Sequence, residues 1–165
     1  MNIRVHKDLL SVPEEVAALY ERAFPANERN TFESMQQRFG DACELLVFEQ
    51  DGQFIGFVLL LTCFDLTHIL YLAVDEPLRG RGYGAQALEA IRRHRPAERI
   101  IADLEDIDPA APNNAERERR MQFYRRGGYE ASDVRYIWRG EKYVMFVCGG
   151  ALDGDEFEAF WQHFS

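Results

Sequence analysis

The sequence predicts an α/β fold built on one mixed β-sheet, in which antiparallel hairpins are combined with a parallel crossover. Three observations support this prediction. Apolar segments joined by tight turns at 50–52 and 65–67 are typical of consecutive antiparallel strands. A strand, a glycine-rich loop, a helix and a second strand follow over 68–104, which indicates a right-handed parallel crossover. Two further apolar segments flank 139–141 and indicate a closing hairpin.

The first quarter of the chain is expected to hold a strand over 1–6 and two helices. Ser11-Val12-Pro13-Glu14 has the spacing of a capping box and an early proline, so a helix is predicted over 14–24. Its apolar residues recur with helical spacing, and Pro25 ends it. The second helix is predicted over 32–39.

The rest of the chain alternates strands with helices. Strands are predicted over 45–49, 53–64, 68–74, 99–104, 129–138 and 142–148. Helices are predicted over 84–94, 115–126 and 153–164. Because no linker or repeat interrupts this order, residues 1–165 are expected to form a single domain, with a core over 1–149 and a C-terminal tail over 150–165.

Composition narrows the class of protein. The 165 residues are 47% hydrophobic, enough to bury a sizeable core without disulfides. Three scattered cysteines indicate neither a disulfide framework nor a metal site. No stretch reaches the roughly 18 apolar residues that span a membrane, and the N-terminus lacks the apolar core of a signal peptide. We therefore expect a cytoplasmic protein with no membrane partner.

The net charge of −9 argues against nucleic acid as a partner. The charge is uneven, because residues 76–139 hold 13 arginines and 11 acids. This part of the chain could bind a small polyanion, since arginine is suited to bidentate phosphate contacts. Alternatively, most of these arginines pair with neighbouring acids on solvated helices.

A glycine-rich loop opens the helix predicted over 84–94. Gly80, Gly82 and Gly84 occupy alternate positions, which lets the backbone approach a ligand closely. The free amides of the first helical turn and the helix dipole favour an anion such as a pyrophosphate. Arg79 and Arg81 add positive charge.

The motif Arg79-x-x-Gly82-x-Gly84 resembles the signature of the GNAT superfamily of acetyl-coenzyme A dependent N-acetyltransferases. The preceding strand, Leu72-Ala73-Val74, is also similar to that family. A second match lies downstream, where Phe123-Tyr124-Arg125-Arg126-Gly127-Gly128-Tyr129 resembles the end of a family helix. The order of elements fits over 1–149.

This resemblance implies a central mixed sheet that is splayed open and flanked by helices, with acetyl-CoA as co-substrate in the gap. The backbone of Leu72, Ala73 and Val74 would bind the pantetheine arm. The pyrophosphate would be bound by Arg79, Gly80, Arg81, Gly82, Tyr83, Gly84 and Ala85. The implied activity is direct acetyl transfer to a primary amine of a small molecule or peptide, and a homodimer stays open.

The chemistry requires a proton acceptor and a proton donor. About one lysine-like amine in a thousand is neutral near pH 7, so a base must take its proton. His68, at a strand start, is the candidate base, since its ordinary pKa suits neutral pH. Tyr124 matches the family's acid, and a nearby arginine is expected to lower its pKa. Glu105 and Asp106 follow a strand and are candidates to bind a cationic amine or to act through water.

One position departs from the family pattern. Many members carry an asparagine seven residues before the tyrosine, where this chain has Arg117. Arg117 could hold a phosphate or an acidic substrate group. Alternatively, it is an exposed arginine paired with Glu116 or Glu118.

Two other functions compete with the acetyltransferase. A non-catalytic acyl-CoA binding or sensing module would keep the loop without needing Tyr124 or a base. An NAD(P)-binding oxidoreductase is suggested by Gly82-x-Gly84-x-x-Ala87 and by Asp103 about twenty residues on. The oxidoreductase is disfavoured because 75–81 separate the strand from these glycines, and because hairpins surround the crossover.

Overall fold

The computed structural model describes all residues from Met1 to Ser165, and they form two compact units. Unit 1 comprises residues 1–62 and 69–91, and unit 2 comprises residues 63–68 and 92–165. Strand β4 (Leu66–Val74) begins in unit 2 and continues into unit 1. The expectation of a single domain over 1–165 stays a prediction.

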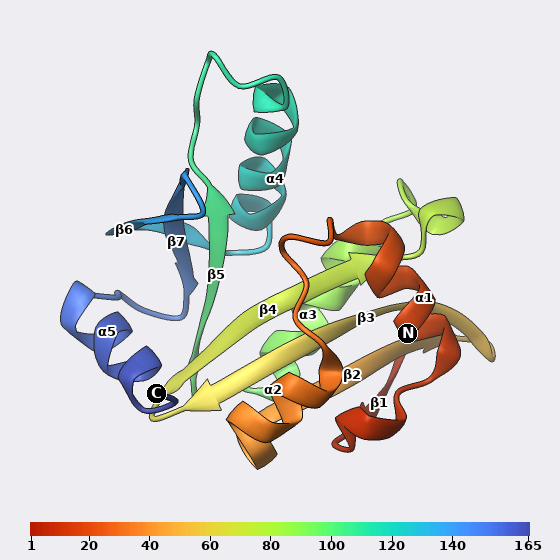
Figure 1. The fold of residues 1–165 in the computed structure, drawn as a ribbon. Helices are drawn as coiled ribbons and strands as arrows, with labels where there is room; N and C mark the ends of the chain where they lie inside the picture. The colour runs from red at the N-terminus through yellow and green to blue at the C-terminus, as the bar shows by residue number, and fades with distance from the viewer. The chain divides into compact units, whose positions relative to one another are not determined.

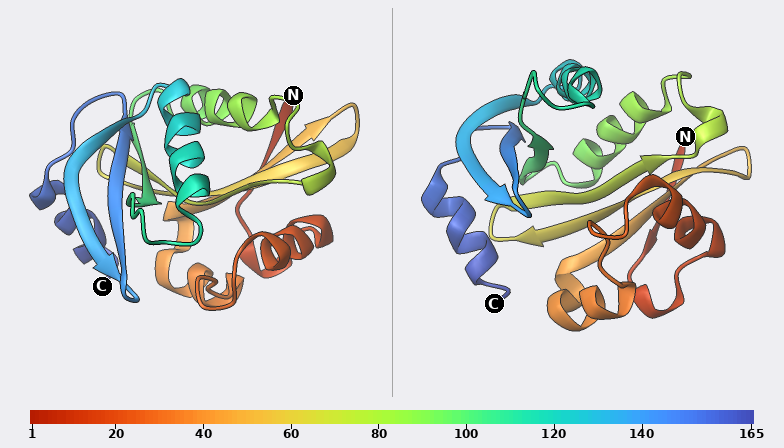
Figure 2. Two further views of the ribbon diagram at one scale, coloured as in Figure 1. Left: turned by 90° about the horizontal axis from the view of Figure 1, so that it is seen from above. Right: turned by 45° about the horizontal axis from the view of Figure 1, so that its top comes forward.

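Unit 1 is a sheet covered by helices on both faces. Its strands are β1 (Asn2–His6), β2 (Cys43–Gln50), β3 (Gln53–Cys63) and most of β4, in that order, and the β1–β2 and β2–β3 pairs are antiparallel. Helices α1 (Glu14–Ala23) and α2 (Phe32–Phe39) lie on one face, and α3 (Tyr83–His94) lies on the other (Figures 1 and 2). Because both faces are covered, β2 and β3 are buried over nearly their whole length.

Unit 2 holds three strands of the seven-stranded sheet and two helices. It contains β5 (Arg99–Glu105), β6 (Glu130–Trp138) and β7 (Glu141–Cys148), and β7 pairs antiparallel with both of the others. Helix α4 (Asn114–Arg126) lies on one face and α5 (Gly154–Gln162) on the other (Figure 2). The strand order β1-β2-β3-β4-β5-β7-β6 confirms the predicted mixed α/β class.

All predicted helices and strands are present, with ends displaced by at most two residues. The predicted capping box at the start of α1 is wrong, because Ser11 lies in a separate helical turn over Leu9–Ser11 and its hydroxyl donates to Asp8. The N-cap of α1 is Pro13, which has no side-chain cap. A capping box is found instead at α5, between Asp153 and Glu156. None of the helices is both long and apolar enough to cross a membrane.

An ion-pair cluster attaches α5 to the start of β5. The guanidinium of Arg99 donates to both carboxylate oxygens of Glu156, one of them at 3.0 Å, and to Asp65 Oδ1 at 2.9 Å. The hydrogen bonds from Arg99 hold the pKa of Glu156 below its ordinary value. Helix α5 is therefore held by a pH-sensitive contact as well as by apolar packing.

We expect Glu156→Gln to lower stability at pH 7 and to have a smaller effect at pH 3. Because the folded-state pKa of Glu156 is lowered, its contribution is complete above the unfolded value of about 4.3 and is lost as pH falls through the folded value. Urea denaturation of the wild type and the variant at both pH values measures this. Glu158→Gln, on the same helix with Gln162 as its partner, is the matched control. Equal losses at both pH values would contradict the expectation.

Candidate active site

The glycine-rich loop lies in unit 1, between the end of β4 and the start of α3. Gly80 and Gly82 have φ values of 78° and 80°, in the left-handed region that favours glycine. A Cβ at either position would meet no atom within 4 Å. The glycines are therefore required by backbone conformation rather than by lack of space, and the loop is open beside them.

This loop presents hydrogen-bond donors and positive charge. The amide of Gln86 donates to the carbonyl of Gly82 at 3.2 Å, so the amides of the three residues between them have no partner within α3. Arg79 is exposed, and its Nε donates to the carbonyl of Val74 at 3.2 Å, which closes the loop onto the end of β4. Arg81 is exposed. The loop thus has the features of an anion-binding helix start.

The end of β4 is packed tightly against β3. The amide of Asp75 donates to the carbonyl of Ile55 at 2.8 Å. A Cβ at Gly56 would overlap the carbonyl oxygen of Ala73, so only glycine allows this approach. Leu72 and Val74 are half-buried. All the residues predicted to bind the cofactor, Leu72 to Val74 and Arg79 to Ala85, therefore lie along one continuous stretch of unit 1.

The predicted acid, Tyr124, lies in unit 2 on the buried face of α4, with 7% of its surface exposed. Its ring packs edge-on against Phe123 and Tyr129, with centroids 5.3 Å and 5.2 Å away. The expected lowering of its pKa is wrong: burial raises the pKa, the charge of Arg120 opposes this, and the carboxylate of Asp103 adds to it. The phenol is therefore fully protonated at neutral pH.

The predicted base, His68, is buried in unit 2 and faces a carboxylate. His68 Nε2 lies 3.2 Å from Asp103 Oδ1, and the hydroxyl of Tyr136 donates to Asp103 Oδ2 at 2.7 Å. His68 Nδ1 is buried with no hydrogen-bond partner. Because Nε2 faces a carboxylate oxygen, it is placed to donate a hydrogen bond to it. Neither ring nitrogen is open to an incoming amine, so this geometry favours a role for His68 in holding Asp103.

The carboxylates of Glu105 and Asp106 are already paired with arginines. Glu105 lies 2.7 Å from Arg117 and 3.8 Å from Arg120, and Asp106 lies 3.4 Å from Arg135. Glu105 is the last residue of β5, and Asp106 follows it directly. Their negative charge is largely neutralised there, which weakens their attraction for a second cation.

Arg117 is buried, with 5% of its surface exposed, which excludes the alternative of an exposed arginine. It does not pair with Glu116 or Glu118. Its ion pairs are with Glu105 at 2.7 Å and Glu141 at 3.3 Å. It also donates to the Asn113 side chain at 2.9 Å and to the carbonyl of Asp106 at 3.0 Å. Arg117 thus joins the start of α4 to β5 and β7.

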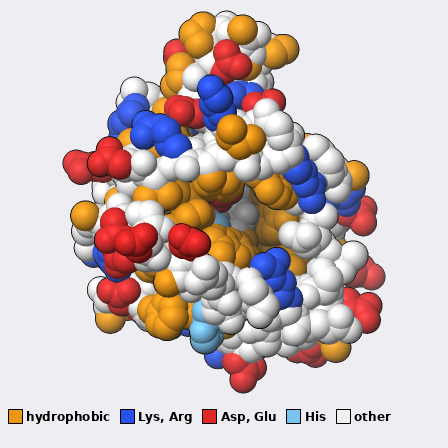
Figure 3. All heavy atoms as spheres, turned by 60° about the vertical axis from the view of Figure 1, so that its left-hand side comes forward, with side chains coloured by type: hydrophobic (Ala, Val, Ile, Leu, Met, Phe, Trp, Pro, Cys, Tyr) orange, Lys and Arg blue, Asp and Glu red, His pale blue; other side chains and the backbone are white.

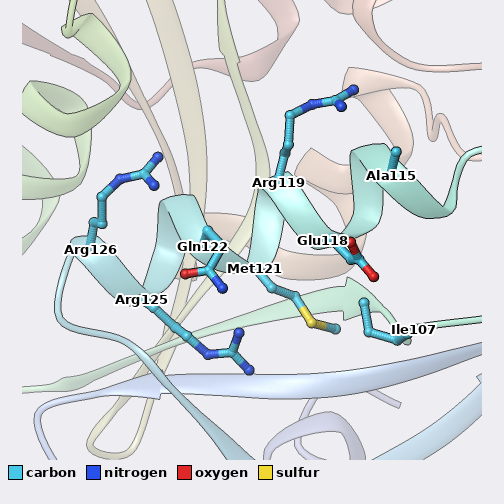
Figure 4. Close-up of a pocket in the computed structure, with 8 residues that line it drawn as sticks. All are labelled: Ile107, Ala115, Glu118, Arg119, Met121, Gln122, Arg125 and Arg126. Atoms are coloured by element: carbon cyan, nitrogen blue, oxygen red, sulfur yellow. The ribbon is translucent and has the colours of Figure 1, made fainter.

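A cavity of about 750 Å³ lies along another side of α4. Its lining consists of Ile107, Ala115, Glu118, Arg119, Met121, Gln122, Arg125 and Arg126 (Figure 4). The side chains of Met121 and Glu118 point toward Ile107. None of the predicted site residues lines it. The structure also has no group of three or more side chains placed to hold a metal ion.

Sequence reasoning missed two residues of the His68 cluster. Asp103 was considered only as a ribose-binding acid of a dinucleotide site, and Tyr136 was not considered. The available signal was an acid in the middle of the apolar segment over 99–104. The order β5-β7-β6 with antiparallel pairs also differs from the parallel sheet of a dinucleotide fold.

Comparison with known families gives one match. Residues 41–131, more than half of the chain, match the model described as the acetyltransferase (GNAT) domain. A comparison with curated protein sequences gives no significant match.

Solved structures share the fold at low sequence identity. A GNAT-family acetyltransferase structure from Bacteroides thetaiotaomicron has a TM-score of 0.72 and 21% identity, covering 91% of this chain and 86% of that one. A GNAT-family acetyltransferase from Elizabethkingia anophelis, with acetyl-CoA bound, has a TM-score of 0.61 and 16% identity, covering 90% and 99%. An aminoglycoside 6'-N-acetyltransferase from Enterococcus faecium has a TM-score of 0.67 and 13% identity, covering 93% and 100%.

Proposed function

Because the chain belongs to the GNAT family of acetyltransferases, we propose that it transfers an acetyl group from acetyl-CoA to a primary amine of a small molecule or peptide. The observation that carries this proposal is the loop over 79–85. Its two left-handed glycines leave the first amides of α3 and two arginines beside an open space. These groups fit the pyrophosphate of acetyl-CoA, and the Leu72–Val74 backbone would hold the pantetheine arm.

The chain's own residues have separate tasks in this reaction. Acetyl-CoA supplies an activated acetyl group: the amine nitrogen bonds to the carbonyl carbon as the bond from that carbon to sulfur breaks. One proton must leave the amine, and one must reach the sulfur. Tyr124 is proposed to hold and donate the second proton, since its phenol is protonated at neutral pH. Water is proposed to carry the first proton away, because His68 is enclosed.

We expect Gly82→Ala to weaken acetyl-CoA binding about tenfold and to lower stability by about 1–2 kcal/mol. An alanine strains the left-handed conformation that aims the loop amides, although space for its Cβ exists. Calorimetry and urea denaturation measure the two effects. Gly154→Ala is the control, because Gly154 has open space and no positive φ. Unchanged affinity in Gly82→Ala would remove the loop from the cofactor site.

Calorimetry of the purified protein with acetyl-CoA and, in parallel, with NAD tests the proposed function. We expect acetyl-CoA to bind with a micromolar dissociation constant and NAD not to bind. Adding a panel of amines to the protein with acetyl-CoA should then release the thiol of coenzyme A. Binding of acetyl-CoA without thiol release from any amine would favour the sensing module. Binding of NAD alone would contradict the proposal.

A further inference from the structure

The carboxylate of Asp103 is the one acid of the β5 segment that no arginine or lysine pairs. One of its oxygens faces His68 Nε2, and the other accepts from the hydroxyl of Tyr136. Two residues further along the chain, Glu105 is paired with Arg117 and Arg120. Asp103 therefore keeps a negative charge that no permanent cation neutralises.

Asp103 is held firmly yet partly open. Its side chain is 29% exposed, whereas the side chain of His68 is 4% exposed. His68 and Tyr136 each fix one carboxylate oxygen, so the carboxylate is oriented before any ligand arrives. Preorganised hydrogen-bond partners of this kind reduce the cost of binding a charged group. They also favour the ionised form, and the pKa of Asp103 lies below its ordinary value.

The surroundings of Asp103 are aromatic. Tyr136 stacks on Tyr143 and on Phe157, with ring centroids 5.3 Å and 5.7 Å away. His68, the other residue that contacts Asp103, has its ring centroid 5.4 Å from that of Trp161 and 6.0 Å from that of Phe160. Figure 3 shows hydrophobic side chains and acidic side chains exposed on one face of the molecule. Aromatic faces attract cations and also accommodate an apolar body.

Asp103 and the proposed proton donor, Tyr124, belong to the same unit. The charge of Asp103 raises the pKa of Tyr124, so the carboxylate and the phenol interact electrostatically within unit 2. A cation bound by Asp103 would therefore reduce the negative charge that acts on this phenol.

We propose that Asp103 binds the ammonium group of the acceptor, and that the acceptor is a monoamine with an aromatic or aliphatic body. This inference rests on the proposed function and narrows it. A polycation would need several unpaired carboxylates, and Glu105 and Asp106 are paired with arginines. His68 and Tyr136 are positioning residues that hold Asp103.

Binding of three probes to the full chain loaded with coenzyme A tests this site without any chemistry. The probes are 2-phenylethylamine, its neutral analogue 2-phenylethanol, and spermine, each titrated by calorimetry. We expect the monoamine to bind at least tenfold more tightly than the alcohol or spermine. Tighter binding of spermine, or equal binding of the amine and the alcohol, would overturn the inference. These comparisons use the wild type and do not depend on a variant that folds.

The variant Asp103→Asn provides a second test. We expect it to lower the affinity for 2-phenylethylamine at least tenfold and to leave the affinity for 2-phenylethanol unchanged. Asp133→Asn is the matched control, because Asp133 is exposed on β6, and it should leave all three affinities unchanged. Unchanged amine affinity in Asp103→Asn would overturn the inference. If Asp103→Asn transfers acetyl groups to amines as fast as the wild type does, the proposed function stands and the inference about Asp103 is wrong.

Discussion

Tyr124→Phe is expected to lower kcat about 100-fold and to leave the affinity for acetyl-CoA unchanged. The substitution removes only the hydroxyl, so the ring contacts with Phe123 and Tyr129 persist. General acid catalysis contributes at least about 100-fold in typical enzymes. Steady-state kinetics with the best amine of the panel measures kcat, and calorimetry measures acetyl-CoA binding.

The control for this variant is Tyr129→Phe. Tyr129 is buried beside Tyr124, and its hydroxyl has no hydrogen-bond partner. Removing that hydroxyl should therefore change neither kcat nor acetyl-CoA affinity by more than about twofold, since it breaks no contact. Equal turnover by the wild type and Tyr124→Phe would remove Tyr124 as the acid, and an equal loss in both variants would indicate a packing effect.

The pH profile gives an independent check on Tyr124. Burial raises the pKa of its phenol, so the protonated form persists above the ordinary value of about 10. We expect no loss of kcat between pH 7 and 9 that can be assigned to this group. A decline in that range in the wild type that is absent in Tyr124→Phe would contradict the raised pKa.

Periodicity predicted the elements well because burial of one face or both leaves a direct trace in the sequence. The predicted ends of strands were less accurate, because a polar or charged residue at the end of a buried strand interrupts the apolar pattern. Strand β2 begins at Cys43 and includes Glu44, which is 3% exposed, and a charged residue is seldom read as part of a buried strand. Thr67 is likewise buried at the start of β4.

The glycine loop was predictable because its conformation is local. Left-handed φ values at Gly80 and Gly82 require glycine whatever surrounds them. The cluster of Asp103 was not predictable in this way. Its partners His68 and Tyr136 lie 35 and 33 residues away in the chain, so no local spacing indicates the contact.

The predictions for the pKa of Tyr124 and for the partners of Arg117 were wrong for related reasons. The pKa prediction used a nearby charge, whereas burial has the larger effect, and the depth of a side chain cannot be read from α4 alone. In the alternative that pairs Arg117 with acids, the partners were its chain neighbours Glu116 and Glu118. Residues next to one another on a helix point in different directions, so they are poor partners. The acids that pair with Arg117 lie on strands instead, Glu105 on β5 and Glu141 on β7.

Arg117→Ala should cost about 3–5 kcal/mol of stability, the largest loss we expect from any single substitution. The variant leaves the carboxylate of Glu105, with a side chain 18% exposed, without its closest cation. Loss of one partner of a buried ion pair typically has an effect of about this size. Urea denaturation measures it, and Arg119→Ala on the exposed side of α4 should change stability by less than about 0.5 kcal/mol.

A double-mutant cycle separates the ion pair from simple loss of packing. If the cost arises from an uncompensated Glu105, then Arg117→Ala combined with Glu105→Ala should lose clearly less stability than the sum of the single variants. Additive losses would mean that Arg117 acts through its contacts with Asn113 and the carbonyl of Asp106 instead. Because these contacts anchor the start of the helix that carries Tyr124, we expect kcat to fall in Arg117→Ala and also in the double variant, since both lack them.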